Sequence, residues 1–192
     1  GNPPASAGFI AIGTAPENLA KEQSAFCEIR LVDQNDDDVS DGQPGELAIR
    51  GPSLFSGYWG NEEANKEAFR NGWFHMGDVF KRDKMGLINF VDRVKYMIKS
   101  GGENIYPAEI EQYILIDQRV SEVVVVRKKD SKWGEVPVAF ISTVSNKLSE
   151  KDVLDMLKGK IASYKLPKEI HFVEPSFFPR TGTGKVQRHL VE

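Results

Sequence analysis

The first half of the chain alternates apolar and polar residues over short stretches, which is the pattern of β-strands with one buried face. Clusters of Pro, Gly, Asn and Asp separate these stretches and are typical of turns. Residues 1–25 show no period and are expected to be a loop or a truncated edge, whereas residues 61–69 have a helical pattern with two glutamates in the first turn. The predicted strands are residues 26–32, 46–50, 78–82 and 87–91.

The second half has a different pattern, in which helical and strand periods alternate. Pro107 is expected to open a helix, because a proline in the first turn loses no hydrogen bond. Residues 123–126 are a continuous run of valine, which is typical of a buried strand. Residues 136–142 and 169–173 are expected to form two further strands.

A helix is also expected after Ser149, which can cap it together with Asp152 three residues later. Val153, Leu157 and Ile161 recur every four residues and would give this helix an apolar face. Helices and strands in this mixture predict an α+β fold, in which a mostly β part precedes a small α+β part.

The change of pattern places a domain boundary near Lys95. The expected domains are therefore residues 1–94 and residues 95–192. A chain of 192 residues is long enough to give each of them an ordinary hydrophobic core.

Composition excludes several classes of function. A formal net charge of −3 gives no positive field for a nucleic-acid partner. No apolar run approaches the length of a membrane span, and no segment resembles a signal peptide. Cys27 is the single cysteine, and the three histidines are scattered, so neither an internal disulfide nor a metal site is expected in this chain. These features favour a cytoplasmic location.

Four motifs follow one another along the chain: GWFHMGD at residues 72–78, DRVK at 92–95, IKSGGENIYPAEIE at 98–111 and PRTGTGK at 179–185. Each motif alone is weak, but their order and intervals are specific. Together they resemble the C-terminal third of an acyl-CoA synthetase (AMP-forming) of the adenylate-forming superfamily, which also contains luciferases and peptide-synthetase adenylation domains. The resemblance implies that the phosphate-gripping loop and most of the carboxylate pocket lie upstream of Gly1.

The resemblance implies a two-domain enzyme that uses ATP, Mg²⁺ and coenzyme A. Residues 1–94 would be the β-rich end of the large adenylation domain, and residues 95–192 the small mobile lid domain, with Lys95 as the hinge. Most Mg²⁺ ligands would lie in the missing N-terminal domain. The carboxylic acid substrate is expected to be a fatty acid, and the 192-residue chain alone is expected to be inactive.

Asp78 and Arg93 are the candidate nucleotide-binding residues. A carboxylate accepts two hydrogen bonds side by side, which suits a ribose diol, and a guanidinium fork suits a ribose oxygen and a phosphate. Without the motifs, Asp78 would be a turn cap and Arg93 a surface partner of Asp92. The family resemblance assigns both to ATP, although Met76 stands where the family usually has threonine.

Ser100, Gly101 and Gly102 are candidates for the second half-reaction. Adjacent glycines permit positive φ and close backbone approach, and they are also common in simple turns. The resemblance implies that this segment lines the tunnel for the pantetheine arm of coenzyme A, where a Cβ at either glycine would intrude.

Lys185 is the candidate catalytic residue. The surrounding loop differs from a Walker phosphate loop, because Pro179 and Val186 stand where that motif requires Gly and Ser or Thr. The resemblance implies that the Lys185 ammonium bridges the substrate carboxylate and the α-phosphate during adenylation. Contacts of this type typically lower a barrier by about 2.7–4 kcal/mol.

The implied mechanism has two steps, formation of an acyl-AMP and then of a coenzyme A thioester, with rotation about Lys95 between them. Two alternatives remain open from the sequence. One is an adenylation module that loads a carrier-protein thiol or performs luciferase-like oxidation. The other is a non-catalytic nucleotide-binding domain that retains the fold.

Overall fold

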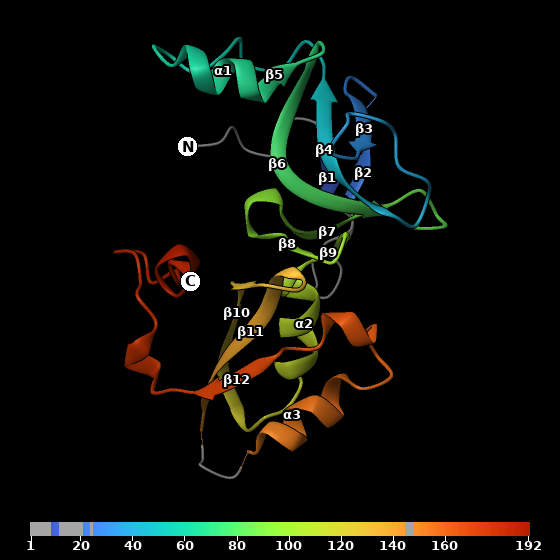
Figure 1. The fold of residues 1–192 in the computed structure, drawn as a ribbon. Helices are drawn as coiled ribbons and strands as arrows, with labels where there is room; N and C mark the ends of the chain where they lie inside the picture. Colours follow the sequence, from blue (N-terminus) through green and yellow to red (C-terminus); the bar gives the residue numbers. More distant parts are fainter. Residues whose placement is uncertain (1–8, 12–20, 24, 145–147) are drawn as a thin grey trace. The chain divides into compact units, whose positions relative to one another are not determined.

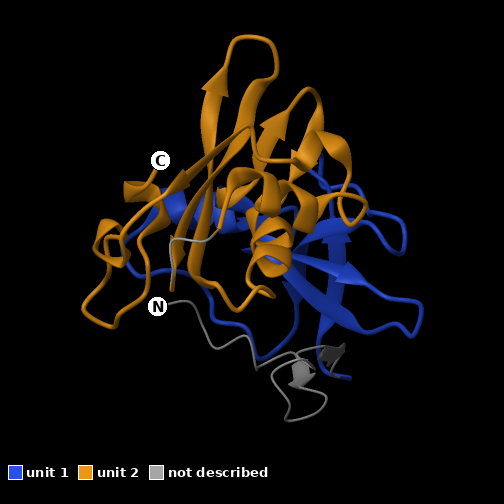
Figure 2. Ribbon diagram, turned by 90° about the horizontal axis from the view of Figure 1, so that it is seen from below, with its two compact units in different colours: residues 1–95 blue, residues 96–192 orange. Residues whose placement is uncertain are grey.

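The computed structural model describes residues 9–11, 21–23, 25–144 and 148–192. The chain divides into two compact units, residues 1–95 and residues 96–192, so that Lys95 is the last residue of the first unit. Figure 2 shows the two units in blue and orange. Each contains its own sheet, helical turns and core, and the α+β fold class is confirmed.

The described part of the first unit contains one seven-stranded antiparallel sheet. Its order is β1 (Phe9–Ala11), β2 (Lys21–Gln23), β7 (Ile88–Arg93), β6 (Trp73–Arg82), β4 (Pro44–Arg50) and β3 (Glu28–Val32), with β5 (Phe69–Arg70) paired to β6. Figure 1 shows β6 as a long, strongly curved strand beside β4. The helix α1 (Glu62–Ala68) begins after Asn61, whose side chain accepts a hydrogen bond from Ala64 N (3.1 Å).

Several predicted boundaries in the first unit are wrong. The stretch expected to be a loop or a truncated edge contains the strands β1 and β2, while its residues 1–8, 12–20 and 24 lie outside the described residues. The strand expected from residue 26 begins at Glu28, because Phe26 is an exposed turn residue. The strand expected from Asp78 begins at Trp73, since an irregularity near Gly77 hides the alternation of the first half of β6.

The second unit pairs β10 (Val120–Asp130) with β11 (Gly134–Thr143) as an antiparallel hairpin. The strand β12 (Glu169–Phe172) joins β11 in parallel, and β8 (Ile98–Ser100) joins β11 near its start. The strand β9 (Glu103–Ile105) pairs with β8. Two helices complete this unit, α2 (Pro107–Ile114) and α3 (Glu150–Leu157). The sequence pattern did not predict β8 and β9, which are too short to show a period.

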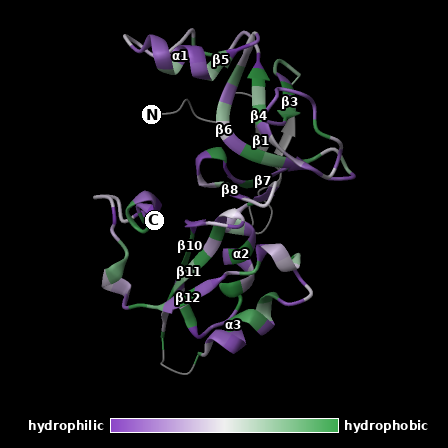
Figure 3. Cartoon of the chain, viewed as in Figure 1, coloured by the Kyte–Doolittle hydropathy of each residue, from purple (hydrophilic) through white to green (hydrophobic). Residues whose placement is uncertain are grey.

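Both faces of the second sheet are covered. Val123 and Val125 belong to the core beside α2 and α3, whereas Val124 and Val126 pack with Phe178 and other residues of the C-terminal segment. In Figure 1 that segment runs along the side of β10–β12 away from the two helices, and Figure 3 shows apolar stretches on β10, β11 and α2. A strand buried on both faces needs apolar residues in succession, so the predicted buried strand is confirmed.

The start of α3 agrees with the prediction. Asp152 N donates to Ser149 Oγ (3.2 Å) and Ser149 N donates to Asp152 Oδ2 (2.9 Å), which is a complete capping box. The expected apolar face is only partly correct, because the helix ends at Leu157 and Ile161 lies beyond it. Gly159 has φ +76°, a left-handed conformation that follows many helix ends.

Candidate functional site

Asp78 and Arg93 are brought together by the pairing of β6 with β7. They occupy directly opposite positions in the register, and Arg93 Nε lies 3.3 Å from Asp78 Oδ1. The Asp78 side chain is 18% exposed and the Arg93 side chain 47% exposed. Asp92 accepts a hydrogen bond from the backbone N–H of Arg93 (2.7 Å). A carboxylate and a guanidinium therefore stand side by side, with the guanidinium open to solvent.

Asp78 sits between two register shifts. The pairing of β4 with β6 is irregular between Glu46 opposite Val79 and Ala48 opposite His75, so β6 carries extra residues there. A second shift in the pairing of β6 with β7 follows Val79. Gly77 lies inside the first shift with φ +73°, a conformation that favours glycine. Such bulges redirect the side chains beside them, and Asp78 directly follows Gly77 in this one.

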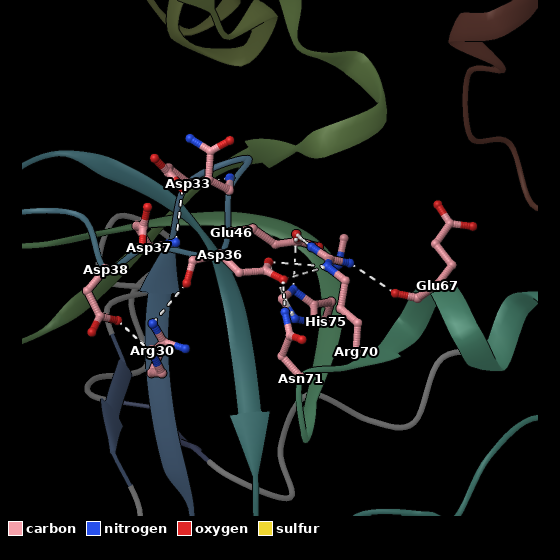
Figure 4. A network of polar contacts seen from close by, with 12 residues as sticks. Arg30, Asp33, Asp36, Asp37, Asp38, Glu46, Glu67, Arg70, Asn71 and His75 are labelled. Carbon is pink, nitrogen blue, oxygen red and sulfur yellow. Dashed lines mark hydrogen bonds and ion pairs between the residues drawn. The ribbon is translucent and has the colours of Figure 1, made fainter.

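Glu46 fixes this irregular segment through both of its carboxylate oxygens. Oε1 accepts the backbone N–H of Gly77 (3.0 Å), while Oε2 accepts from Arg70 Nη2 (2.8 Å) and lies 3.3 Å from His75 Nδ1. Arg70 also donates to Asp36 (3.2 Å), which accepts from Asn71 as well (2.6 Å). Figure 4 shows these side chains converging between β4 and β6.

This network was not found from the sequence. Its members lie between about two and three dozen residues apart, for instance 29 positions between His75 and Glu46 and 34 between Arg70 and Asp36. No local period links side chains at such separations. The available signal was the charged Glu46 inside an otherwise apolar strand, which a buried partner must balance.

Two carboxyl groups of this region, those of Asp78 and Asp36, have shifted pKa values. Burial raises the pKa of Asp78, Arg93 opposes this shift, and the negative charges of Glu46 and Asp92 add to it. Burial acts on Asp36 as well, but the hydrogen bond from Asn71 and the charge of Arg70 prevail and lower the pKa of Asp36. Asp78 is therefore the carboxylate whose ionisation is costly here.

Ser100, Gly101 and Gly102 lie at the turn of the β8–β9 hairpin. Ser100 pairs with Glu103, and the two glycines between them have φ +60° and +87°, as in a type I′ turn. A Cβ on Gly101 would come within 2.7 Å of the Trp133 ring, whereas within the described residues a Cβ on Gly102 would meet no atom within 4 Å. Gly101 is thus constrained by the Trp133 ring and by its φ, and Gly102 by its φ, whereas the intrusion into a pantetheine tunnel stays a prediction.

Lys185 lies at a hairpin of the C-terminal segment. Thr181 N donates to Lys185 O (2.8 Å), Gly184 N donates to Thr181 O (2.9 Å), and Arg180 bridges to Val186. The Lys185 side chain is exposed. Within the described part of the chain its ammonium makes no hydrogen bond or ion pair, so its charge is available to an anion.

The remaining predicted features were Lys95 and the absence of metal and membrane sites. Lys95 is exposed in the short 3₁₀ turn Val94–Tyr96 at the junction of the units. Among the described residues, no three His, Cys, Asp or Glu side chains gather closely enough to hold a metal ion. No helix of the described segments is both long and apolar enough to cross a membrane.

Comparison with known proteins places these features in a family. Residues 109–185 match the AMP-binding enzyme C-terminal domain. The chain is 42% identical over 170 residues to an indoleacetate–CoA ligase of Aromatoleum aromaticum, covering 88% of the chain and 33% of the relative. It is also 42% identical over 147 residues to a long-chain-fatty-acid–CoA ligase of Mycobacterium tuberculosis, covering 77% and 29%.

The fold agrees with the sequence matches. The structure of o-succinylbenzoate CoA synthetase from Bacillus subtilis, solved with its acyl-adenylate intermediate, superimposes with a TM-score of 0.79 at 32% identity over 89% of this chain and 34% of that protein. The chain thus spans about a third of the length of the relatives it matches. Residues 109–185 belong to the AMP-binding enzyme C-terminal domain family, and the chain as a whole is similar to about a third of the length of several CoA ligases.

Proposed function

We propose that the full-length protein is an ATP-dependent acid–thiol ligase that makes an acyl-AMP and then a coenzyme A thioester. The observation that carries this proposal is the Asp78–Arg93 pair, at directly opposite positions of β6 and β7 and 3.3 Å apart. It joins a carboxylate acceptor for a ribose diol to a donor fork for a phosphate. The relatives that match this chain are CoA ligases, which supports the same activity.

In the first step, a carboxylate oxygen of the acid attacks the α-phosphorus of ATP and pyrophosphate leaves. Asp78 accepts hydrogen bonds from the ribose hydroxyls, and Arg93 donates to a ribose oxygen and a phosphate. The exposed Lys185 ammonium lies between the acid and the α-phosphate and offsets the negative charge that gathers there. Mg²⁺, when bound with ATP, would offset the negative charge of the leaving pyrophosphate, and no cluster of described residues of this chain gathers to hold it.

In the second step, the sulfur of the thiol attacks the acyl carbonyl, the thiol proton is lost, and AMP leaves with the bonding electron pair. The β8–β9 turn at Ser100, Gly101 and Gly102 lines the path of the pantetheine arm. Lys185 and this turn lie on two different hairpins of the second unit, so each step uses its own hairpin. Rotation of residues 95–192 about Lys95 exchanges them, in the manner of a lid that gates turnover.

The proposed acid is a fatty acid and the proposed thiol is coenzyme A, in the cytosol. The long-chain-fatty-acid–CoA ligase of Mycobacterium tuberculosis supports a fatty acid, while the indoleacetate–CoA ligase makes an aryl acid the competing outcome. The pocket that selects the acid is expected in the part of the relatives' length that this chain does not span. The test offers the full-length protein a panel of fatty and aryl acids, each with coenzyme A or with a phosphopantetheinylated carrier protein. The thioester that accumulates identifies both the acid and the thiol that the protein uses.

The test of the activity uses the full-length protein with an acid, Mg-ATP and coenzyme A. Pyrophosphate, AMP and thioester are expected in equal amounts, and Asp78→Asn is expected to raise the KM for ATP with little change in the KM for the acid. A protein that binds ATP but releases neither pyrophosphate nor AMP with any acid would contradict the proposal. The 192-residue chain alone is expected to form no acyl-AMP.

A further inference from the structure

The Arg188 guanidinium lies three residues beyond Lys185 and makes a two-pronged contact with α2. Nη1 donates to Glu111 Oε1 (2.6 Å) and Nη2 donates to Glu111 Oε2 (3.0 Å). The side chains are 16% and 12% exposed, so water competes little for either charge. Bidentate pairs of this kind fix orientation as well as distance. Sequence reasoning missed this pair, because 77 positions separate its members.

The same two side chains also hold the backbone of β10. Glu111 Oε1 accepts the N–H of Val125 (2.7 Å), and Arg188 Nη1 donates to the Val125 carbonyl. Since β10 is the edge strand of its sheet, these groups find no partner strand on that side among the described residues. The guanidinium also lies over the Tyr96 ring, 4.9 Å from its centre. Tyr96 directly follows Lys95, so Arg188 contacts the first residue of the second unit.

The other end of the Lys185 hairpin is fixed to β10 as well. Arg180 Nη2 lies 2.5 Å from Glu122 Oε2, and Arg180 Nη1 donates to the carbonyl of Gly184 (3.1 Å). Gln187 N donates to Pro179 O (2.8 Å) and closes the stem. The hairpin therefore has a base held at both ends, and an exposed tip that carries Lys185.

We propose that Arg188 is a positioning residue for adenylation, which fixes the base of the Lys185 hairpin to α2, β10 and Tyr96. This inference rests on the proposed function. Lys185 has a flexible four-carbon stem, so the place of its ammonium depends on how firmly its backbone is held. Electrostatic stabilisation acts only when the charge is in place before the reaction, and a misplacement of about 1 Å can cost about 10²-fold in rate.

The test measures the two half-reactions separately in the full-length protein. Arg188→Gln is expected to lower kcat for acyl-AMP formation by about 10²-fold, with little change in the KM for ATP and in thioester formation from supplied acyl-AMP. The single variant leaves the buried Glu111 charge unpaired. The double variant Arg188→Gln with Glu111→Gln removes that charge, so it is expected to restore folding without restoring the two-pronged contact between the side chains. Arg188→Lys keeps a cation beside Glu111 and is expected to recover only part of the rate.

A matched control is Arg127→Gln, which breaks the ion pair of a β10 arginine with Glu192 (3.1 Å) downstream of the hairpin. It is expected to leave both half-reactions unchanged. Wild-type adenylation by the double variant, or an equal loss of both half-reactions in all Arg188 variants, would overturn the positioning role. Failure of all three variants to fold would overturn it too, because Arg188 would then serve the fold itself. Adenylation by the wild-type protein and by Lys185→Ala separates the two claims. The proposed function fails if the wild-type protein forms no acyl-AMP, whereas the positioning role fails if Lys185→Ala retains adenylation, because Arg188 would then have no catalytic group to position.

Discussion

Gly77, the residue before Asp78, donates its backbone N–H across the register shift to the Glu46 carboxylate, at 3.0 Å. The conformation of the segment that presents the nucleotide-binding candidate is thus set by an acidic side chain on the neighbouring strand. The same carboxylate contacts Arg70 and His75, so one residue joins the β6 bulge to the polar network between the strands.

Glu46→Ala is expected to destabilise the β4–β6 region by about 1–3 kcal/mol, because the Gly77 N–H loses its acceptor in a shielded place. Glu46→Gln is expected to cost less, since the amide oxygen can still accept that hydrogen bond. Amide hydrogen exchange of β4 and β6 measures the local free energy of opening. Glu28→Gln on β3 is the control, because its carboxylate is 63% exposed and its loss is expected to stay within about 0.5 kcal/mol.

The raised pKa of Asp78 predicts a pH dependence of nucleotide binding. The ionised carboxylate accepts both ribose hydroxyls, so binding is complete above the raised pKa and is lost as the pH falls through it. The loss therefore begins at a higher pH than for an ordinary aspartate. Titration calorimetry with AMP, from about pH 7 down to about pH 4, covers the window.

The midpoint of this pH dependence is the pH at which half of the nucleotide binding is lost. Substitution of the charged neighbours of Asp78 should move it in opposite directions. Arg93→Gln removes the charge that lowers the pKa of Asp78 and is expected to shift the midpoint upward, whereas Glu46→Gln removes a charge that raises it and is expected to shift the midpoint downward. Shifts of the same sign in both variants would contradict the assignment of the titration to Asp78.

The raised pKa of Asp78 also predicts that its ionised form, which nucleotide binding requires, lowers the stability of the folded protein. A folded-state pKa above the unfolded value means that folding favours the protonated form of Asp78, so stability rises as the pH falls through the raised pKa and is reduced above it. Asp78→Asn is therefore expected to stabilise the first unit at neutral pH while it weakens nucleotide binding. A variant that is both less stable and weaker in binding would indicate a structural role for the carboxylate.

The two turn glycines should respond differently to substitution. Gly102→Ala is expected to cost about 1–2 kcal/mol through its positive φ alone. Gly101→Ala is expected to cost about 1–3 kcal/mol more, because the new Cβ meets the Trp133 ring at 2.7 Å. Hydrogen exchange of β8 and β11 measures the loss of local stability. Trp133→Ala in the Gly101→Ala background is expected to recover the additional cost of Gly101→Ala over Gly102→Ala. Equal losses at the two glycines would be inconsistent with the packing of Trp133 on Gly101.

The sequence predicted correctly those helices and strands whose signals lie within a few neighbouring residues. The Ser149–Asp152 cap and the valine run of β10 depend on neighbours in sequence, and both were found. The strands β8 and β9 were missed because three residues show no period, and the first half of β6 was missed because the bulge at Gly77 breaks the alternation. Gly159 was the overlooked stop signal that leaves Ile161 outside α3.

The residues of the candidate site also fall into two groups, those that the sequence identified and those that it missed. Asp78, Arg93 and Lys185 were identified by family motifs, and the structure adds that the first two face each other and that the third is exposed. Glu46, which contacts Gly77, gave only the signal of a charge among apolar residues, and Arg188, the proposed positioning residue, gave none. Their partners lie dozens of positions away, and only the pairing of strands and the packing of the C-terminal segment bring them together.

Lys185→Ala in the full-length protein gives the most direct measurement, because it asks whether one ammonium group serves one half-reaction. Acyl-AMP formation from acid and Mg-ATP is expected to fall by about 10²–10³-fold, while thioester formation from supplied acyl-AMP stays at the wild-type rate. Gly102→Leu is expected to give the reverse pattern. Equal losses of both half-reactions in both variants would contradict a lid that presents two different hairpins in turn.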